Sequence, residues 1–166
     1  GSKTDAGTYT VTCNGAANYS NSSCSFTINK VAASITCANR NYNGNNQNMY
    51  SAATGCSSIT NGTKKDAGTW TLTCNPDGNH NTSPTCKATI NKVAASITCA
   101  NRTYNGSAQN MYSASSGCAS ITNGSKTDAG SWTLTCNPDG NHNTSPTCSA
   151  TMNKAASSIT CTNRNY

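Results

Sequence analysis

The sequence predicts an all-β fold of small, disulfide-stapled repeats, and three observations support this prediction. Short segments alternate polar and apolar residues with period 2, as TWTLTC does at 69–74, and no longer window has the 3.6-residue apolar period of a helix. Asn-Gly turn dipeptides, at 43–44 and 61–62, separate such segments. The chain also holds 11 cysteines among 166 residues, a density typical of a disulfide scaffold.

A long internal repeat organises the chain. NKVAASITCANR at 29–40 recurs at 91–102 and, as NKAASSITCTNR, at 153–164, which gives a period of 62 residues. GSKTDAGTYTVTC at 1–13 also recurs twice, in the forms GTKKDAGTWTLTC and GSKTDAGSWTLTC. Boundaries at the Asn-Lys junctions predict a partial repeat at 1–30, complete repeats at 31–92 and 93–154, and a partial repeat containing a first strand at 155–166.

Four short strands are expected within a repeat. ASITC at 95–99 opens the second complete repeat, and SIT at 58–60 lies near the middle of the first. At 69–74 a tryptophan, a leucine and a cysteine fall on one face and threonines on the other, as in a half-buried strand. KATI at 87–90 continues the alternation. Strands this short, at this spacing, predict a small sandwich.

One stretch, CNPDGNHNTSPTC, occurs identically at 74–86 and 136–148, and its Asp and His raise the question of a metal or catalytic site. Its Asn-Pro-Asp-Gly start is a strong turn signal. The corresponding loop at 13–24 keeps both cysteines but has neither Asp nor His, and the Cys-x2-Cys pairs of zinc sites do not occur. We therefore predict a hairpin turn with a solvated His, and no catalytic residue, metal or cofactor.

Three motifs resemble a known family of repeats. DAGTYTVT at 5–12, DAGTWTLT at 66–73 and TYNGSAQ at 103–109 are similar to motifs of the MBG-type bacterial immunoglobulin-like repeats found in large surface proteins and adhesins. The resemblance covers nearly the whole chain. It implies tandem immunoglobulin-like β-sandwiches of about 62 residues each.

The Asp-Ala-Gly-x-aromatic motif also resembles the tyrosine corner of immunoglobulin sandwiches, in which the phenol bonds back to the backbone. The resemblance implies this bond for Tyr9, whereas the tryptophans of the later repeats would fill the core instead. The residues assigned to this corner are Asp5, Gly7 and Tyr9, then Asp66, Gly68 and Trp70, and finally Asp128, Gly130 and Trp132.

Four cysteines per repeat permit three pairings, and sequence alone does not choose among them. Locality favours neighbours along the chain; a crossed pattern, Cys37–Cys74 with Cys56–Cys86, and bridges between adjacent repeats remain alternatives. The local pattern pairs Cys13 with Cys24, Cys37 with Cys56, Cys74 with Cys86, Cys99 with Cys118, and Cys136 with Cys148. It leaves Cys161 unpaired, with a partner expected beyond Tyr166.

Charge and hydropathy weigh against several classes of protein. The net charge is +6, but Lys and Arg are spread singly apart from the adjacent Lys64 and Lys65, which does not favour a nucleic-acid surface. No apolar run approaches the roughly 18 residues of a membrane span. No nucleophile–base pair or carboxylate pair recurs in every repeat, so no enzyme is predicted. The cysteine content predicts an extracellular or cell-surface location.

The leading functional hypothesis is a non-catalytic stalk or fibre segment of a secreted or surface-anchored repeat protein. Neighbouring repeats of the same chain would stack into a semi-rigid rod, and copies of the chain could associate into a homo-oligomer or filament. The alternative is an adhesin that binds glycans or a host surface through many weak contacts. Its candidate ligand-binding residues are Tyr42, Tyr50, Tyr104 and Tyr112.

Overall fold

The computed structural model describes residues 1–166 and contains strands and no helices, which confirms the predicted all-β class. The chain divides into two compact units, Gly1–Asn91 and Lys92–Tyr166. Each unit has its own hydrophobic core. No helix long and apolar enough to cross a membrane is present.

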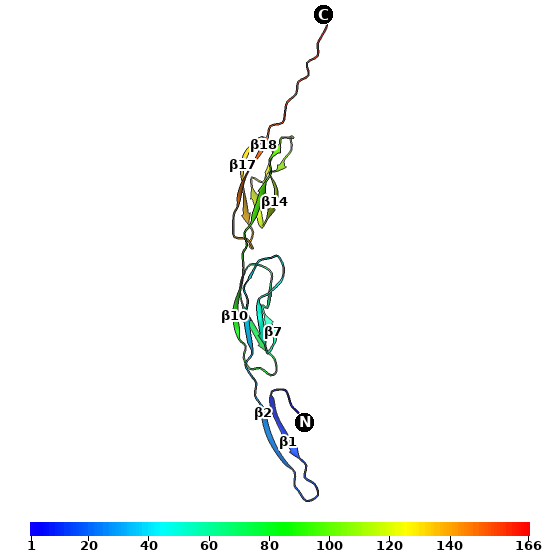
Figure 1. Ribbon diagram of the computed structural model, residues 1–166, viewed down its shortest axis with the longest axis vertical. Coiled ribbons are helices and arrows are strands. Elements are labelled where there is room, and N and C mark those ends of the chain that lie inside the picture. Colours follow the sequence, from blue (N-terminus) through cyan, green and yellow to red (C-terminus); the bar gives the residue numbers. More distant parts are fainter. The chain divides into compact units, whose positions relative to one another are not determined.

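The first unit begins with a hairpin of two strands, β1 (Gly7–Cys13) and β2 (Ser22–Ile28), which pair antiparallel (Figure 1). Hydroxyl side chains pair across it, with 3.0 Å between Thr8 Oγ1 and Thr27 Oγ1. No third strand joins this sheet, and two of its large apolar side chains, Val11 and Phe26, are 51% and 40% exposed. The hairpin therefore buries little apolar surface of its own.

The remaining strands of the first unit form what we call the first strand set. They are β3 (Ser34–Cys37), β4 (Arg40–Asn41), β5 (Gln47–Asn48), β6 (Tyr50–Thr54), β7 (Cys56–Thr60), β8 (Thr63–Lys64), β9 (Gly68–Pro76) and β10 (Thr85–Asn91). The principal sheet has the order β4-β10-β9-β7, and β10 pairs parallel with β4 and antiparallel with β9. Two short ribbons, β3-β6 and β5-β8, complete the set.

The predicted alternation at 69–74 forms the middle of β9. Leu72 and Cys74 have no exposed surface, whereas the intervening threonines lie toward solvent. Across the sheet, Thr69 Oγ1 and Thr89 Oγ1 are 2.8 Å apart, so the polar face is joined by side-chain hydrogen bonds. The burial pattern of β9 thus follows the period-2 pattern of its sequence.

The Asn-Gly dipeptide at 61–62 makes the turn between β7 and β8. Asn61 adopts a left-handed conformation with φ of 59°, which asparagine tolerates better than most residues. Its side-chain Nδ2 donates to the carbonyl oxygen of Thr71 at 3.0 Å, and the backbone N of Gly62 donates to the carbonyl of Ile59 at 3.3 Å. The amide side chain thereby ties the turn to the neighbouring β9.

The core of the first strand set lies between β9–β10 and the β3–β6 ribbon. Its fully buried side chains are Met49, Leu72, Ala88 and Ile90. Ile35 of β3 packs against them from the other layer. Four such side chains are few for a domain of this length, and domains with thin cores usually need covalent or metal cross-links to stay folded.

The second unit repeats this arrangement as the second strand set. Its strands are β11 (Ser96–Cys99), β12 (Arg102–Thr103), β13 (Gln109–Asn110), β14 (Tyr112–Ser116), β15 (Cys118–Thr122), β16 (Ser125–Lys126), β17 (Gly130–Pro138) and β18 (Thr147–Asn153). The principal sheet has the order β12-β18-β17-β15. Met111, Leu134, Ala150 and Met152 form its buried core.

Residues 154–166 form no strand and are exposed throughout, although the sequence predicts a first strand within 155–166. The physical reason lies in pairing. β3 is stabilised by pairing with β6, and β11 by pairing with β14, whereas residues 154–166 pair with no strand in the structure.

Candidate functional site: the disulfide-linked hairpin loop

The cysteines form two nested disulfides in each strand set. The bridges are Cys37–Cys86 and Cys56–Cys74 in the first set, and Cys99–Cys148 and Cys118–Cys136 in the second. Cys13, Cys24 and Cys161 are free and exposed. The local pairing expected from the sequence, 13–24, 37–56, 74–86, 99–118 and 136–148, is therefore wrong, and the crossed alternative is wrong as well.

The strand register explains why Cys74 and Cys86 do not bond. Cys86 lies directly opposite Leu72, so Cys74 is its diagonal neighbour. Diagonal Cα atoms are about 7–8 Å apart, beyond the usual limit of about 6.8 Å for a disulfide. The hairpin β1–β2 repeats this geometry, because Cys24 lies opposite Val11 and is therefore diagonal to Cys13.

The β3–β6 ribbon separates the other predicted pair. Cys37 lies opposite Tyr50 at one end of the ribbon. Cys56 follows the opposite end, where Thr54 pairs with Ser34. Residues at the two ends of one ribbon cannot be bridged without breaking it, so Cys37 and Cys56 do not bond each other.

Each bridge has a distinct structural role. Cys37–Cys86 joins the β3–β6 ribbon to the principal sheet and closes a loop with a sequence separation of 49 residues. Cys56–Cys74 joins β7 to β9 within that sheet, with a separation of 18. The chain-entropy treatment assigns about 4 kcal/mol to the longer loop and about 3 kcal/mol to the shorter one.

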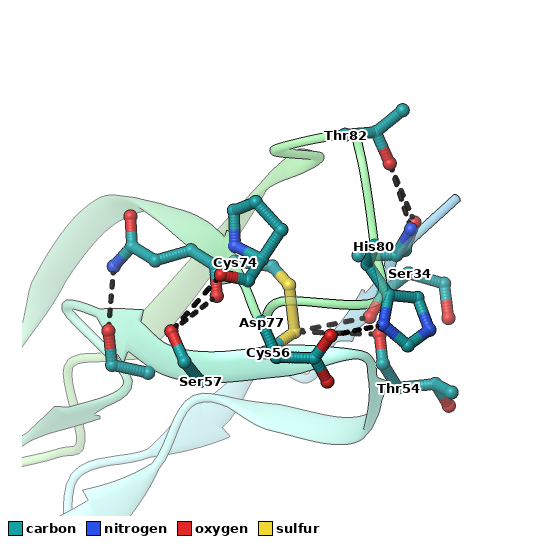
Figure 2. The surroundings of a disulfide bond; sticks show 12 residues. Ser34, Thr54, Cys56, Ser57, Cys74, Asp77, His80 and Thr82 are labelled. Carbon is teal, nitrogen blue, oxygen red and sulfur yellow. Dashed lines mark hydrogen bonds and ion pairs between the residues drawn. A yellow bond between two sulfur atoms is a disulfide. The ribbon is translucent and has the colours of Figure 1, made fainter. Parts of the chain in front are cut away.

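Next to the Cys56–Cys74 bridge, the loop after β9 holds a hydrogen-bonded Asp–His pair (Figure 2). His80 Nδ1 lies 2.6 Å from Asp77 Oδ1 and donates to the carboxylate, which can only accept when ionised. The backbone N of Asn79 donates to the same oxygen at 2.9 Å. These two bonds lower the pKa of Asp77 below its ordinary value of 3.8, with the His80 side chain as the larger cause.

His80 is not solvated, contrary to the sequence-based prediction. Its side chain is 15% exposed, and the equivalent His142 is 9% exposed. The imidazole lies against Gly55, where an added Cβ would come within 2.2 Å of the ring. Gly55 also has φ of 72°, a left-handed conformation that favours glycine. The sequence signal for this contact was the recurrence of both partners, as Gly117 and His142.

The loop pairs with the segment that enters β3. The N of Val31 donates to the carbonyl of Asn79 at 3.2 Å, and the N of Asn81 donates back to the carbonyl of Val31 at 3.0 Å. The N of Ala33 donates to Thr82 Oγ1 at 2.9 Å, a bond drawn in Figure 2. These hydrogen bonds therefore hold residues 31–33, which lead into β3, against the loop between β9 and β10.

The chain gathers no group of three or more His, Cys, Asp or Glu side chains that could hold a metal ion. The loop brings two of the candidate ligands together, Asp77 and His80, and directs both toward its own backbone and each other. The Asp–His pair therefore stabilises the conformation of its own loop.

The Asp5–Tyr9 motif lies at the start of the hairpin. The Tyr9 hydroxyl donates to the carbonyl oxygen of Asp5 at 2.8 Å, so the phenol bonds back to the backbone as expected for this residue. In the first strand set the Trp70 ring packs on Gly68, whose added Cβ would lie 3.0 Å from it. Trp70 also packs against the core, as does Trp132 beside Gly130.

A lysine lies over each corner aromatic. Lys3 Nζ is 5.0 Å from the centre of the Tyr9 ring, and Lys64 Nζ is 5.6 Å from that of Trp70. The third pair, Lys126 over Trp132, is separated by 5.3 Å. Asp66 and Asp128 are exposed just before β9 and β17.

The four tyrosines considered for glycan binding do not share one environment. Tyr42, Tyr50 and Tyr112 pack against the two hydrophobic cores, whereas Tyr104 is 42% exposed. No protein-family model, curated protein or solved structure matches the chain.

Proposed function

We propose that the chain is a non-catalytic stalk or fibre segment of a secreted or surface-anchored repeat protein, similar to the MBG-type repeats of surface proteins and adhesins. Four disulfides indicate an oxidising environment, extracellular or secreted. The side chains best suited to chemistry, Asp77 and His80, are engaged in holding the loop together. Both features suit a part whose task is to stay folded outside the cell.

One observation carries the proposal: within Gly1–Asn91 the N-terminal hairpin is bonded to the first strand set. The side-chain Oδ1 of Asn79 accepts from the backbone N of Ala6 at 2.7 Å. The same amide donates through Nδ2 to Asp5 Oδ1 at 3.2 Å. One asparagine of the Asp–His loop thus satisfies two groups of the preceding hairpin, and such a bond would stiffen the junction of a linear array.

We predict that replacing Asn79 with alanine makes the hairpin β1–β2 more mobile relative to the first strand set. The Asn79→Ala change removes both hydrogen bonds to the hairpin and leaves the backbone bond from Val31 to residue 79 intact. Backbone ¹⁵N relaxation of the full chain should then show faster local motion in β1 and β2 only.

Asn81→Ala is the matched control, because Asn81 is exposed and bonds through its backbone. Its relaxation should match that of the parent chain. Hairpin residues that already move independently in the parent chain would contradict the stalk proposal.

Adhesion is the competing function, and the exposed Tyr104 is the observation in its favour. The other three tyrosines pack against the cores, so they would have to leave the cores to form a continuous aromatic face with Tyr104. A glycan array probed with the full chain separates the two functions. The stalk proposal predicts no selective binding, and specific binding lost on Tyr104→Ala would favour adhesion.

A further inference from the structure

Each strand set contains two Asn-Gly dipeptides. One of them, at 61–62 or 123–124, forms the turn between β7 and β8 or between β15 and β16. The other, at 43–44 or 105–106, lies between β4 and β5 or between β12 and β13. Asparagine is a thermolabile residue, and a following glycine makes it more so, because no side chain blocks the glycine nitrogen from approaching the asparagine side chain.

The turn between β7 and β8 holds both reacting groups of Asn61 in place. The side-chain Nδ2, which would leave as ammonia, donates to the carbonyl oxygen of Thr71 at 3.0 Å. The backbone N of Gly62, which would attack the side chain, is buried and donates to the carbonyl of Ile59 at 3.3 Å. In the second strand set, the equivalent bonds are Asn123 Nδ2 to Thr133 and Gly124 N to Ile121, at 2.9 and 3.2 Å.

The other dipeptide of each set lies in an exposed turn without these two restraints. Asn43 and Gly44 are exposed, and no atom lies within 4 Å of a Cβ added to Gly44. The side chain of Asn43 is held through Oδ1, which accepts from the backbone N of Asn45 at 3.0 Å. Asn105 is equally exposed, and its Oδ1 accepts from the backbone N of Ser107 at 3.0 Å.

The hydrogen bond at Oδ1 favours attack on the side chain. When the Gly44 nitrogen bonds to Cγ of Asn43, negative charge develops on Oδ1 in the tetrahedral intermediate. A backbone N–H that already donates to this oxygen stabilises that charge. The same bond leaves Nδ2 free to depart, whereas the bond from Asn61 to Thr71 restrains that nitrogen.

We propose that Asn43 and Asn105, the exposed pair, are sites of spontaneous deamidation that their turns promote. The turns at Asn61 and Asn123, the protected pair, hold these residues in an unreactive arrangement. This inference goes beyond the proposed function, because it rests on turns within the two strand sets and holds whether or not the protein is a stalk.

The reaction needs only water. The backbone N of Gly44 loses its proton to water and bonds to Asn43 Cγ, the bond from Cγ to Nδ2 breaks, and Nδ2 takes up a proton and leaves as ammonia. The product is a five-membered succinimide ring. Water then opens the ring at either carbonyl and yields aspartate or isoaspartate. In sum, one water is consumed, one ammonia is released, and nothing is oxidised or reduced.

Deamidation of the exposed pair changes the charge of the chain and leaves the cores untouched. Each event replaces a neutral amide with a carboxylate, so two events lower the formal net charge of +6 by two. The extra backbone atom of isoaspartate falls in an exposed turn that packs against nothing at Gly44 or Gly106. Cation-exchange chromatography should therefore resolve folded species of stepwise lower charge.

Asn105 and Asn123 give the closest comparison, because Gly-Ser follows both of them. The two residues that follow are the same, so a difference in rate must come mainly from the fold. One hydrogen bond corresponds to about a fivefold change in an equilibrium constant, so two that must break together predict a rate about 25-fold lower at Asn123.

The experiment incubates the folded, oxidised full chain in mildly alkaline buffer and measures the products by peptide mapping with mass spectrometry. We expect the exposed pair to accumulate aspartate and isoaspartate faster than the protected pair by about that factor. The variant Asn43→Asp/Asn105→Asp marks the position of the fully converted chain in cation exchange, and circular dichroism verifies that the converted fraction is folded.

The reduced and denatured chain is the matched control, because all four turns are then lost. Its four asparagines should react at similar rates, and the exposed pair should react no faster there than in the folded chain. Equal rates at Asn105 and Asn123 in the folded chain, or the same difference between them after denaturation, would overturn the proposal. A folded chain whose exposed pair stays intact while the denatured chain is converted would overturn it as well.

Discussion

At the residue scale, the Asp–His loop depends on a glycine that lies far from it in the sequence. Gly55 lets the chain turn with positive φ and leaves room for the His80 ring. The ring in turn positions Asp77, whose backbone N donates to the carbonyl of Gly55 at 3.0 Å. The sequence could indicate the turn from Asn-Pro-Asp-Gly, but it could not show that the imidazole packs on a distant backbone, because that contact depends on the tertiary fold.

We predict that Gly55→Ala destabilises the first strand set by more than the cost of its backbone conformation alone. A left-handed conformation costs a non-glycine residue about 1–2 kcal/mol, and the new methyl would also displace His80. Native-state hydrogen exchange at the Leu72 amide measures the loss.

Gly44→Ala is the matched control, because Gly44 has φ of 78° but has no atom within 4 Å of an added Cβ. It should show the backbone cost alone. Equal losses for both variants would show that the packing of His80 on Gly55 contributes nothing.

The Asp–His pairs predict how stability depends on pH. Hydrogen bonds from the histidine side chains, and then from the backbone, lower the pKa of Asp77 and Asp139 below 3.8. A carboxyl whose pKa is lower when folded stabilises the protein above its unfolded pKa, and this contribution disappears as the pH falls through the folded value. The melting temperature should therefore fall below about pH 4 through this term.

The double variant Asp77→Asn/Asp139→Asn removes both titrating groups. Its melting temperature should vary less between pH 4 and pH 2 than that of the parent chain, as followed by circular dichroism. Parallel curves for the two proteins across that interval would refute a stabilising role for the ionised carboxylates.

At the element scale, the sequence predicted strands better than it predicted their pairing. The alternation at 69–74 lies within β9, and the turn at 61–62 lies between β7 and β8. The two-residue strands, such as β4, carry no pattern long enough to recognise. The disulfide pairing depends on register, which places Leu72 and not Cys74 opposite Cys86, and proximity in sequence does not report register.

Removing each bridge should reveal its different role. The chain-entropy treatment predicts a loss of about 4 kcal/mol for Cys37→Ala/Cys86→Ala and about 3 kcal/mol for Cys56→Ala/Cys74→Ala. Urea unfolding, with hydrogen exchange assigning the transition to the first strand set, measures both. The unaltered second set serves as the internal reference, and an unchanged first set in the Cys37→Ala/Cys86→Ala variant would contradict the inter-layer role of that bridge.

At the scale of the whole molecule, the two strand sets have the same architecture. Each strand set has four fully buried core side chains, two nested disulfides and one Asp–His loop. The 62-residue repeat predicted this equivalence because identical segments adopt identical pairings. The sequence could not predict the unpaired tail at 154–166, since strand formation there depends on a partner and not on local propensity.

The nested bridges should close each strand set against extension, and pulling the chain between handles at residues 31 and 154, which leaves out the hairpin β1–β2 with its free cysteines, tests this most directly. Under oxidising conditions, Cys37–Cys86 and Cys99–Cys148 should hold the enclosed residues, so no long unfolding step appears. After reduction, each set should release about 160 Å, because 49 residues extend at about 3.3–3.6 Å each. If the bridges instead joined Cys37 to Cys56 and Cys74 to Cys86, the residues between 56 and 74 would lie outside both loops and would extend by about 60 Å. Steps of that length from the oxidised chain would contradict the nested pairing.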